Sequence, residues 1–285
     1  MDSEVGGVTT AVVGGEAPHV SSGLKRVGSA VVLIPLFVGI VVAPAWVFTA
    51  LLVLVSAVAA WELARMFARA GRPAHPAVAA AAAAVVTVSF AVPGAPGATL
   101  TVCVLALLAA SLYGAGATLS LDPTMIGVLA LVYVGWLLGY AVLLRHRPDG
   151  AALVLFLVGV TWVGESAAYV VGSLVGRHPL APVISPRKTI EGGTAQVVGS
   201  VVGAALLAHW LVPEWTVTRA VAAGGVLGLT GQVGDLAESV MKRGLRVKDA
   251  GDLIPGHGGM LDRIDGLLVN APVLFYFARW TGSAQ

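Results

Sequence analysis

Acidic residues concentrate in one part of this chain, because six of its fifteen carboxylates fall between positions 235 and 265. Asp235 and Glu238 interrupt an otherwise apolar run, where an ionised side chain is costly and marks a functional candidate. Glu238 and Ser239 follow Asp235 by three and four residues. Lys242 follows by seven, so all four share one face of a helix. We expect Glu238 to pair with Lys242 at the helix end. Asp235 lies about 10 Å below Lys242 along the helix, and we expect it to have a functional role.

A second acidic pair, Asp262 and Asp265, opens the last apolar run of the chain. We expect one of the two to cap a helix, since an acid at the N-cap accepts hydrogen bonds from free backbone N–H groups. If the two acids face the helix that carries Asp235, they also provide oxygen ligands for a hard cation such as magnesium.

Glycines and basic residues lie between these two acidic pairs. Gly256, Gly258 and Gly259 surround His257, and a backbone with so little side-chain cover can approach a phosphate closely. A polyphosphate with its metal needs such a backbone, acids and cations together. We expect His257 either to protonate a leaving pyrophosphate or to be structural. The cations expected to meet phosphate charge are Lys242, Arg243, Lys248 and Arg263.

A second polar segment, ISPRKTIEGG at 184–193, combines a hydroxyl, a cation and glycines. Ser185 before Pro186 predicts a helix N-cap with proline in the first turn. The two glycines after Glu191 predict the end of that short helix. Such a turn, with Lys188 and Thr189 in it, is either a simple connection or a cradle for phosphate.

Another carboxylate, Glu165, lies in the apolar stretch TWVGESAAYVVG. An unpaired carboxylate is expensive there, so we expect a cation partner. The predicted helices place Glu165 and Asp235 at a similar depth, where they could share a cavity.

The elements that must position these residues are membrane helices. The chain is 57% hydrophobic, with a mean hydropathy of +0.89, and has apolar runs longer than a soluble core helix needs. The net charge of +2 is too small and dispersed for nucleic-acid binding, and the single Cys103 excludes a disulfide framework. We predict an all-α integral membrane protein of about nine transmembrane helices. The runs are Val27–Val42, Trp46–Met66, Pro76–Val92, Ala98–Ala117, Met125–Leu144, Ala151–Val175, Ala195–Trp215, Arg219–Met241 and Asp262–Trp280.

Charge at the ends of these runs predicts their orientation. With a cytoplasmic N-terminus, thirteen of the seventeen Lys and Arg residues fall on the inner side, which follows the positive-inside tendency. The four exceptions are Arg145, Arg147, Arg219 and Arg279. We therefore expect a disordered cytoplasmic tail at 1–24, transmembrane helices at 25–150, and a catalytic region at 151–285 with its two polar segments in the cytoplasm.

The acidic, basic and glycine residues between positions 239 and 265 resemble the signature of the phosphatidate cytidylyltransferase family, also called CDP-diacylglycerol synthases. The segment at 185–192 resembles the family's second motif, and the likeness extends over roughly 164–266. The resemblance implies a dimeric enzyme of the cytoplasmic (inner) membrane that uses magnesium to transfer CMP from CTP to phosphatidic acid for phospholipid biosynthesis. The signature residues are Ser239, Lys242, Arg243, Lys248, Asp249, Gly251, Pro255, His257, Gly258, Gly259, Asp262, Arg263 and Asp265.

The resemblance also implies roles for individual residues. The family's metal-binding acids map onto Asp235 and Asp262, and Glu165 stands where the family usually has Asp, so it is a third ligand or a structural residue. Taken with the chemistry above, the predicted catalytic residues are Lys242, Arg243, Lys248, His257 and Arg263. The predicted substrate-binding residues are Ser185, Lys188, Thr189, Glu191, Ser239, Asp249, Gly258, Gly259 and Asp265.

Two other functions would also use membrane-embedded acids. A CDP-alcohol phosphotransferase needs Asp-Gly followed by Ala-Arg and further spaced acids, and the LLVNAPV segment after Gly266 supplies neither. An ion-coupled transporter would use Glu62, Glu165 and Asp235 along an ion pathway. It would be recognised by inverted repeats or broken helices, whereas the charges here gather in loops suited to phosphate.

Overall fold

The computed structural model describes residues 20–113, 120–247, 250–251 and 259–282. The chain divides into two compact units, Met1–Gly39 and Ile40–Gln285. The first helix, α1 (Val20–Val42), begins inside the segment expected to be a tail. All of the contacts described below belong to the second unit.

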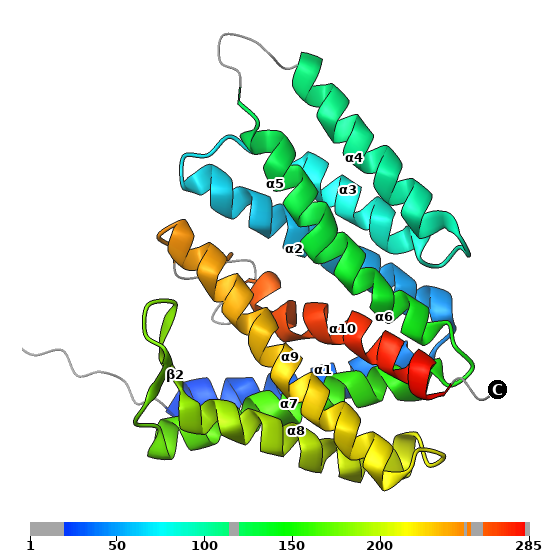
Figure 1. Cartoon of the computed structure of the whole chain (residues 1–285), viewed down its shortest axis with the longest axis vertical. Helices are drawn as coiled ribbons and strands as arrows, with labels where there is room; N and C mark the ends of the chain where they lie inside the picture. Colours follow the sequence, from blue (N-terminus) through cyan, green and yellow to red (C-terminus); the bar gives the residue numbers. More distant parts are fainter. Residues whose placement is uncertain (1–19, 114–119, 248–249, 252–258, 283–285) are drawn as a thin grey trace, which may run out of the picture. The chain divides into compact units, whose positions relative to one another are not determined.

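Long helices make up most of the second unit (Figure 1). Within the described residues, each predicted apolar run after the first overlaps one of these helices or one continuous helical rod. The rod at 122–145 contains a π-helical turn, η1, in its middle. The elements are α2 (Ala45–Arg69), α3 (Pro76–Ser89), α4 (Ala95–Tyr113), α5 (Asp122–Ala130), η1 (Leu131–Trp136), α6 (Leu137–Arg145), α7 (Gly150–Val175), β1 (Pro179–Ala181), β2 (Ser185–Thr189), α8 (Ile190–Leu211), α9 (Val217–Gly244) and α10 (Leu261–Thr281).

Four helical segments of the described residues are long and apolar enough to cross a membrane: α2, the rod at 122–145, α7 and α8. Shorter apolar helices occur at Val31–Val42, Pro76–Ser89 and Ala95–Ser111. The structure is therefore that of a helical membrane protein, as the composition predicted.

The segment at 184–193 folds differently from the prediction. Residues 185–189 form β2, which pairs antiparallel with β1, so the predicted N-cap at Ser185 is wrong. The cap of α8 is Thr189, whose hydroxyl accepts a hydrogen bond from the N–H of Gly192 at 3.1 Å. The predicted helix end at the two glycines is also wrong, because both lie in the first turn of α8. A Cβ on Gly192 would lie 3.0 Å from the Ala168 carbonyl oxygen, so glycine here lets α8 approach α7.

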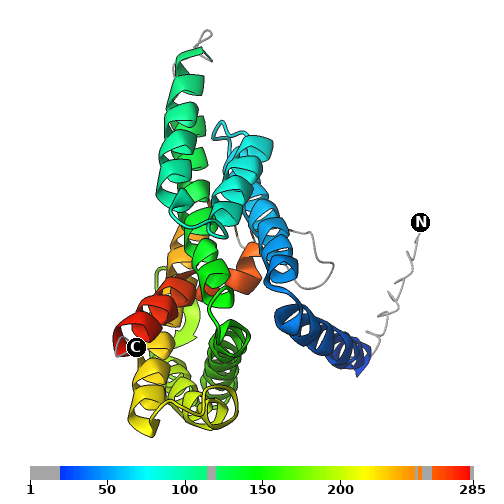
Figure 2. The same ribbon diagram turned by 90° about the vertical axis from the view of Figure 1, so that its right-hand side faces the viewer.

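Glycines also bring α8, α9 and α10 close together, and Figures 1 and 2 show these three helices grouped with α7. A Cβ on Gly228 of α9 would lie 2.8 Å from Val197 Cα of α8. A Cβ on Gly234 would lie 2.5 Å from the Asp265 carbonyl oxygen of α10. Small residues permit such close packing of helices in membranes. The approach at Gly234 is what brings the acids of α9 and α10 together.

A buried polar cluster fixes the register of the same helices. Asn270 of α10 is completely buried. Its amide nitrogen donates to Thr161 of α7 at 3.0 Å, and its amide oxygen accepts from Thr230 of α9 at 2.6 Å. Because a buried amide is costly without partners, these bonds favour one alignment of α7, α9 and α10.

Candidate active site

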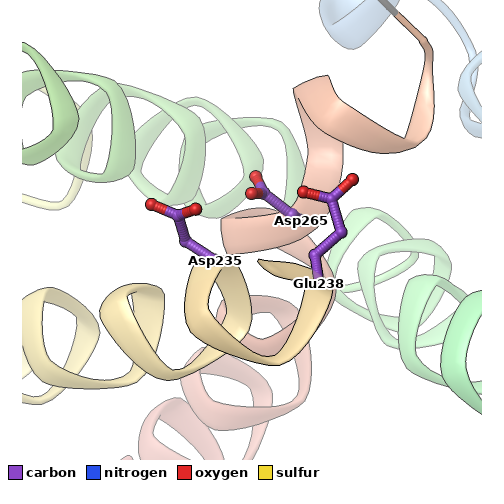
Figure 3. A group of neighbouring side chains, drawn as sticks. All are labelled: Asp235, Glu238 and Asp265. Carbon is purple, nitrogen blue, oxygen red and sulfur yellow. The ribbon is translucent and has the colours of Figure 1, made fainter. Parts of the chain in front are cut away.

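Three carboxylates from two helices meet at the centre of the site. Figure 3 shows Asp235 and Glu238 projecting from one face of α9 on either side of Asp265 of α10. One oxygen from each lies within 4.8 Å of the others. Within the described part of the chain, the buried Oε1 of Glu238 has no hydrogen-bond partner. A concentration of acidic oxygens of this kind suits a hard cation.

Lys242 connects this cluster to Asp262. Its ammonium lies 2.8 Å from Glu238 Oε2, which confirms the predicted ion pair, and 2.7 Å from Asp262 Oδ1. All three side chains are largely buried, with Glu238 only 1% exposed. One cation therefore holds two carboxylates from different helices, an arrangement that partly offsets the cost of burying their charge.

Asp262 holds the turn that precedes α10. Its Oδ2 accepts hydrogen bonds from the N–H groups of Ala250, at 3.2 Å, and Gly259, at 2.9 Å. The N-cap of α10 is Met260, so neither Asp262 nor Asp265 occupies the predicted capping position. Asp262 lies in the first turn of α10, where the positive end of the helix dipole favours an acid, and Asp265 follows one turn later on the same helix.

The hairpin β1–β2 brings the second polar segment to the same place. Lys188 forms an ion pair with Asp235, and Arg243 donates to the Ile184 carbonyl oxygen at 3.2 Å. Glu191 accepts from the His178 ring at 2.6 Å, and so it fixes the base of the hairpin. The two segments that the sequence analysis singled out are therefore in direct contact.

A cavity of about 560 Å³ lies between α7, β2, α8 and α9. Its volume falls in the range of small-molecule sites. Glu165 enters it from α7 and also contacts α10, since a Cβ on Gly266 would lie 2.7 Å from Glu165 Oε1. The polar residues that line the cavity include Glu165, Tyr169, Ser185, Lys188, Thr189, Gln196, Gln232 and Asp235.

Other predicted site residues are spread around this centre. Ser239 follows Glu238 on α9, and Arg263 is an exposed residue in the first turn of α10. Gly259 contacts Asp262 through its N–H group. The predictions for Lys248, Asp249, His257 and Gly258 fall outside the described residues.

Two residues of the N-terminal half reach the site without having been predicted there. Tyr133, on the π-helical turn η1, has a buried hydroxyl and lies within electrostatic range of Glu238, Asp265 and Asp235. Glu62 of α2 accepts a hydrogen bond from the N–H of Leu261, the first residue of α10. A tyrosine in an apolar run is not by itself a sign of a functional site, so Tyr133 could not have been predicted from the sequence. Glu62 did carry a signal, as an acid in a membrane run, but its partner could not be read from spacing.

The fold and the site define a helical membrane protein in which acids and cations converge on one cavity. The profile of the cytidylyltransferase family matches residues 24–281, so the chain belongs to that family. It is 37% identical over 155 residues to a phosphatidate cytidylyltransferase of Staphylococcus saprophyticus, covering 52% of this chain and 56% of the relative.

Two further relatives match a similar share. A phosphatidate cytidylyltransferase of Synechocystis is 40% identical over 134 residues, covering 47% of this chain and 45% of the relative. The uncharacterised protein YnbB of Escherichia coli K12 is 41% identical over 153 residues, covering 54% and 50%. The chain thus spans about half the length of the curated relatives it matches.

Proposed function

We propose that this protein transfers CMP from CTP to phosphatidic acid and so forms CDP-diacylglycerol and pyrophosphate for phospholipid biosynthesis. One observation carries the proposal: the carboxylates of Asp235, Glu238 and Asp265 meet beside the cations Lys188 and Lys242 at a cavity. Membership of the cytidylyltransferase family and the names of its relatives support it. Neither the family membership nor the names of the relatives favour an ion-coupled transporter.

The reaction joins two anions, so its main obstacle is electrostatic. A phosphate monoester is already ionised at neutral pH, and its oxygen can attack the α-phosphorus of CTP without an obligatory base. The bond to the departing pyrophosphate then breaks. The proposed role of Lys188, Lys242, Arg243 and Arg263 is to offset the phosphate charge and to orient the two substrates.

The residues present fit a magnesium ion. Acidic oxygens from two helices lie close enough to share a cation, and one of the buried oxygens, Glu238 Oε1, lacks a hydrogen-bond partner among the described residues. We propose that Asp235 holds the metal together with Glu238 and Asp265 of this cluster. The resemblance also implies Asp262 as a ligand, and Lys242 links it to Glu238 at the edge of the cluster. When bound, magnesium would neutralise phosphate charge and stabilise the leaving group. Glu165, across the cavity, is a further proposed ligand.

The membrane setting completes the proposal. Nine crossings with a cytoplasmic N-terminus place the cavity at the inner face of the cytoplasmic membrane, where a lipid phosphate and a soluble nucleotide can meet. The enzyme is proposed to act as a homodimer, in line with the family resemblance.

The decisive experiment supplies the purified full chain with phosphatidic acid, magnesium and CTP labelled at the α-phosphorus. We expect label in the lipid and an equal amount of pyrophosphate. CTP labelled at the γ-phosphorus is the matched control and should label only pyrophosphate. If the lipid stays unlabelled with α-labelled CTP, or gains label from γ-labelled CTP, the proposed transfer is wrong.

A further inference from the structure

Glu62 of α2 is a buried acid far from the two polar segments in sequence. It is 1% exposed, and its Oε2 accepts a hydrogen bond from the N–H of Leu261 at 3.0 Å. Leu261 is the first residue of α10, and the N-cap, Met260, supplies no side-chain cap. A helix start needs acceptors for its free N–H groups and favours negative charge. Glu62 therefore supplies from another helix the hydrogen-bond acceptor that the N-cap residue lacks.

The same carboxylate occupies the space beside two glycines. A Cβ on Gly251 would lie 2.5 Å from Glu62 Oε1, and a Cβ on Gly259 would lie 2.8 Å from Glu62 Oε2. Both distances are shorter than real contacts of a Cβ. Gly251 does not have a positive φ, so its backbone conformation would accept a side chain. What excludes a side chain at Gly251 is Glu62, which supplies all three of the nearest atoms.

The turn that Glu62 holds leads directly into the proposed active site. Asp262 follows Leu261 and accepts from the N–H groups of Ala250 and Gly259. Its other oxygen contacts Lys242, which in turn contacts Glu238. A displacement of the start of α10 would therefore move Asp262 and its cation together.

We propose that Glu62 is a positioning residue: its carboxylate fixes the start of α10, and through it Asp262 and Lys242, and it requires glycine at position 251. The part that concerns catalysis rests on the proposed CMP transfer. The part that concerns α10 does not, because it can be measured without substrate.

Glu62→Leu tests the hydrogen bond, since leucine has a similar volume and no acceptor. We expect faster hydrogen exchange in peptides spanning Leu261 and a loss of turnover between about tenfold and a hundredfold, as small misplacements of catalytic groups cause. Glu62→Gln keeps an acceptor oxygen and should retain most of the turnover. Unchanged exchange or full turnover in Glu62→Leu would overturn the proposal, as would a Glu62→Gln variant that is equally impaired.

Ser56→Ala is the matched control on the same helix. Ser56 is completely buried and accepts from the Thr87 hydroxyl at 2.8 Å, away from the site. This variant should lower the melting temperature and leave turnover and exchange at Leu261 unchanged. A similar loss of turnover in Ser56→Ala would mean that any disturbance of α2 has this effect and would overturn the specific role of Glu62.

A double-substitution cycle tests the steric claim. Gly251→Ala should reduce turnover in the natural chain but add nothing in a Glu62→Ala background, because the obstacle has been removed. Gly259→Ala should remain harmful in both backgrounds, since its Cβ would also lie 2.9 Å from the backbone nitrogen of Gly251. Additive losses for Gly251→Ala and Glu62→Ala would overturn the claim. If the natural chain transfers no CMP, the proposed function fails, and hydrogen exchange at Leu261 still decides the role of Glu62 in positioning α10.

Discussion

Lys188 of β2 and Asp235 of α9 form an ion pair, and both side chains line the same cavity. This pair joins the hairpin segment to the carboxylate cluster. A metal-bound phosphate needs a carboxylate for the metal and a cation for the phosphate at neighbouring points. The pair provides both charges at one place in the cavity. Removal of the carboxylate charge should therefore impair the reaction.

Asp235→Asn and Asp262→Asn should each reduce CMP transfer by at least on the order of a hundredfold while the protein stays folded in the membrane. The amide keeps the shape of the side chain but removes the charge that binds a cation. Transfer of label from CTP to lipid is the measurement. Asp149→Asn is the control, because Asp149 pairs with Arg147 outside the site. Turnover like that of the natural chain in either site variant would exclude that acid from the metal site.

Gly234→Ala should separate α9 from α10. Its Cβ would lie 2.5 Å from the Asp265 carbonyl oxygen, a backbone atom that cannot move without shifting the helix. Overpacking of this kind costs about 1–3 kcal/mol of unfolding free energy, and it should also reduce turnover, because Asp235 and Asp265 would move apart.

Gly225→Ala on the same helix is the matched control. The nearest atom to its Cβ would be Val201 Cγ2 at 3.8 Å, an ordinary contact. Thermal unfolding in detergent and the transfer assay should distinguish the two variants. Equal stability of both would contradict the close approach of α9 and α10 at Gly234.

The orientation of the helices can be tested with single cysteines in a Cys103→Ala background. Pro186→Cys and Gly244→Cys lie at exposed positions near the site and should react only with reagent added from the cytoplasm. Glu214→Cys, in the exposed turn between α8 and α9, should react only from the opposite side. Reaction of Pro186→Cys from outside, or of all three from one side, would contradict the predicted topology.

The helices could be predicted because membrane helices leave long apolar runs, and within the described residues the runs after the first all overlap helices or the continuous rod at 122–145. The pairing of Glu238 with Lys242 was predictable from helical spacing alone. The hairpin was not, because Ser185 before Pro186 is also typical of a helix start. Thr189 is the cap instead, since β2 continues up to that residue.

Contacts between helices that are distant in the chain could not be predicted from the sequence. The proximity of Asp265 to Asp235 depends on the close packing at Gly234, and the contact of Glu62 with Leu261 depends on how α2 packs against α10. Spacing along one helix carries no information about either. The sequence could mark these acids as costly in a membrane, but only the packing supplies their partners.

Substitutions of Glu165 test whether the metal site extends across the cavity to α7. Its carboxylate contacts α10 at Gly266, beside Asp265, and lines the cavity with Asp235. If it helps to hold magnesium, Glu165→Gln should raise the magnesium concentration needed for half-maximal rate, because the amide keeps the size and loses the charge. Glu165→Asp should have a smaller effect, since it retains the charge on a side chain shorter by one methylene.

Titration of CMP transfer against magnesium in both variants measures this difference directly. Glu214→Gln, an exposed acid in the turn between α8 and α9, should leave the midpoint unchanged and serves as the control. A lower maximal rate at an unchanged midpoint in Glu165→Gln would remove Glu165 from the metal site. Its role would then be to hold α7 against α10, a role that the contact with Gly266 would explain by itself.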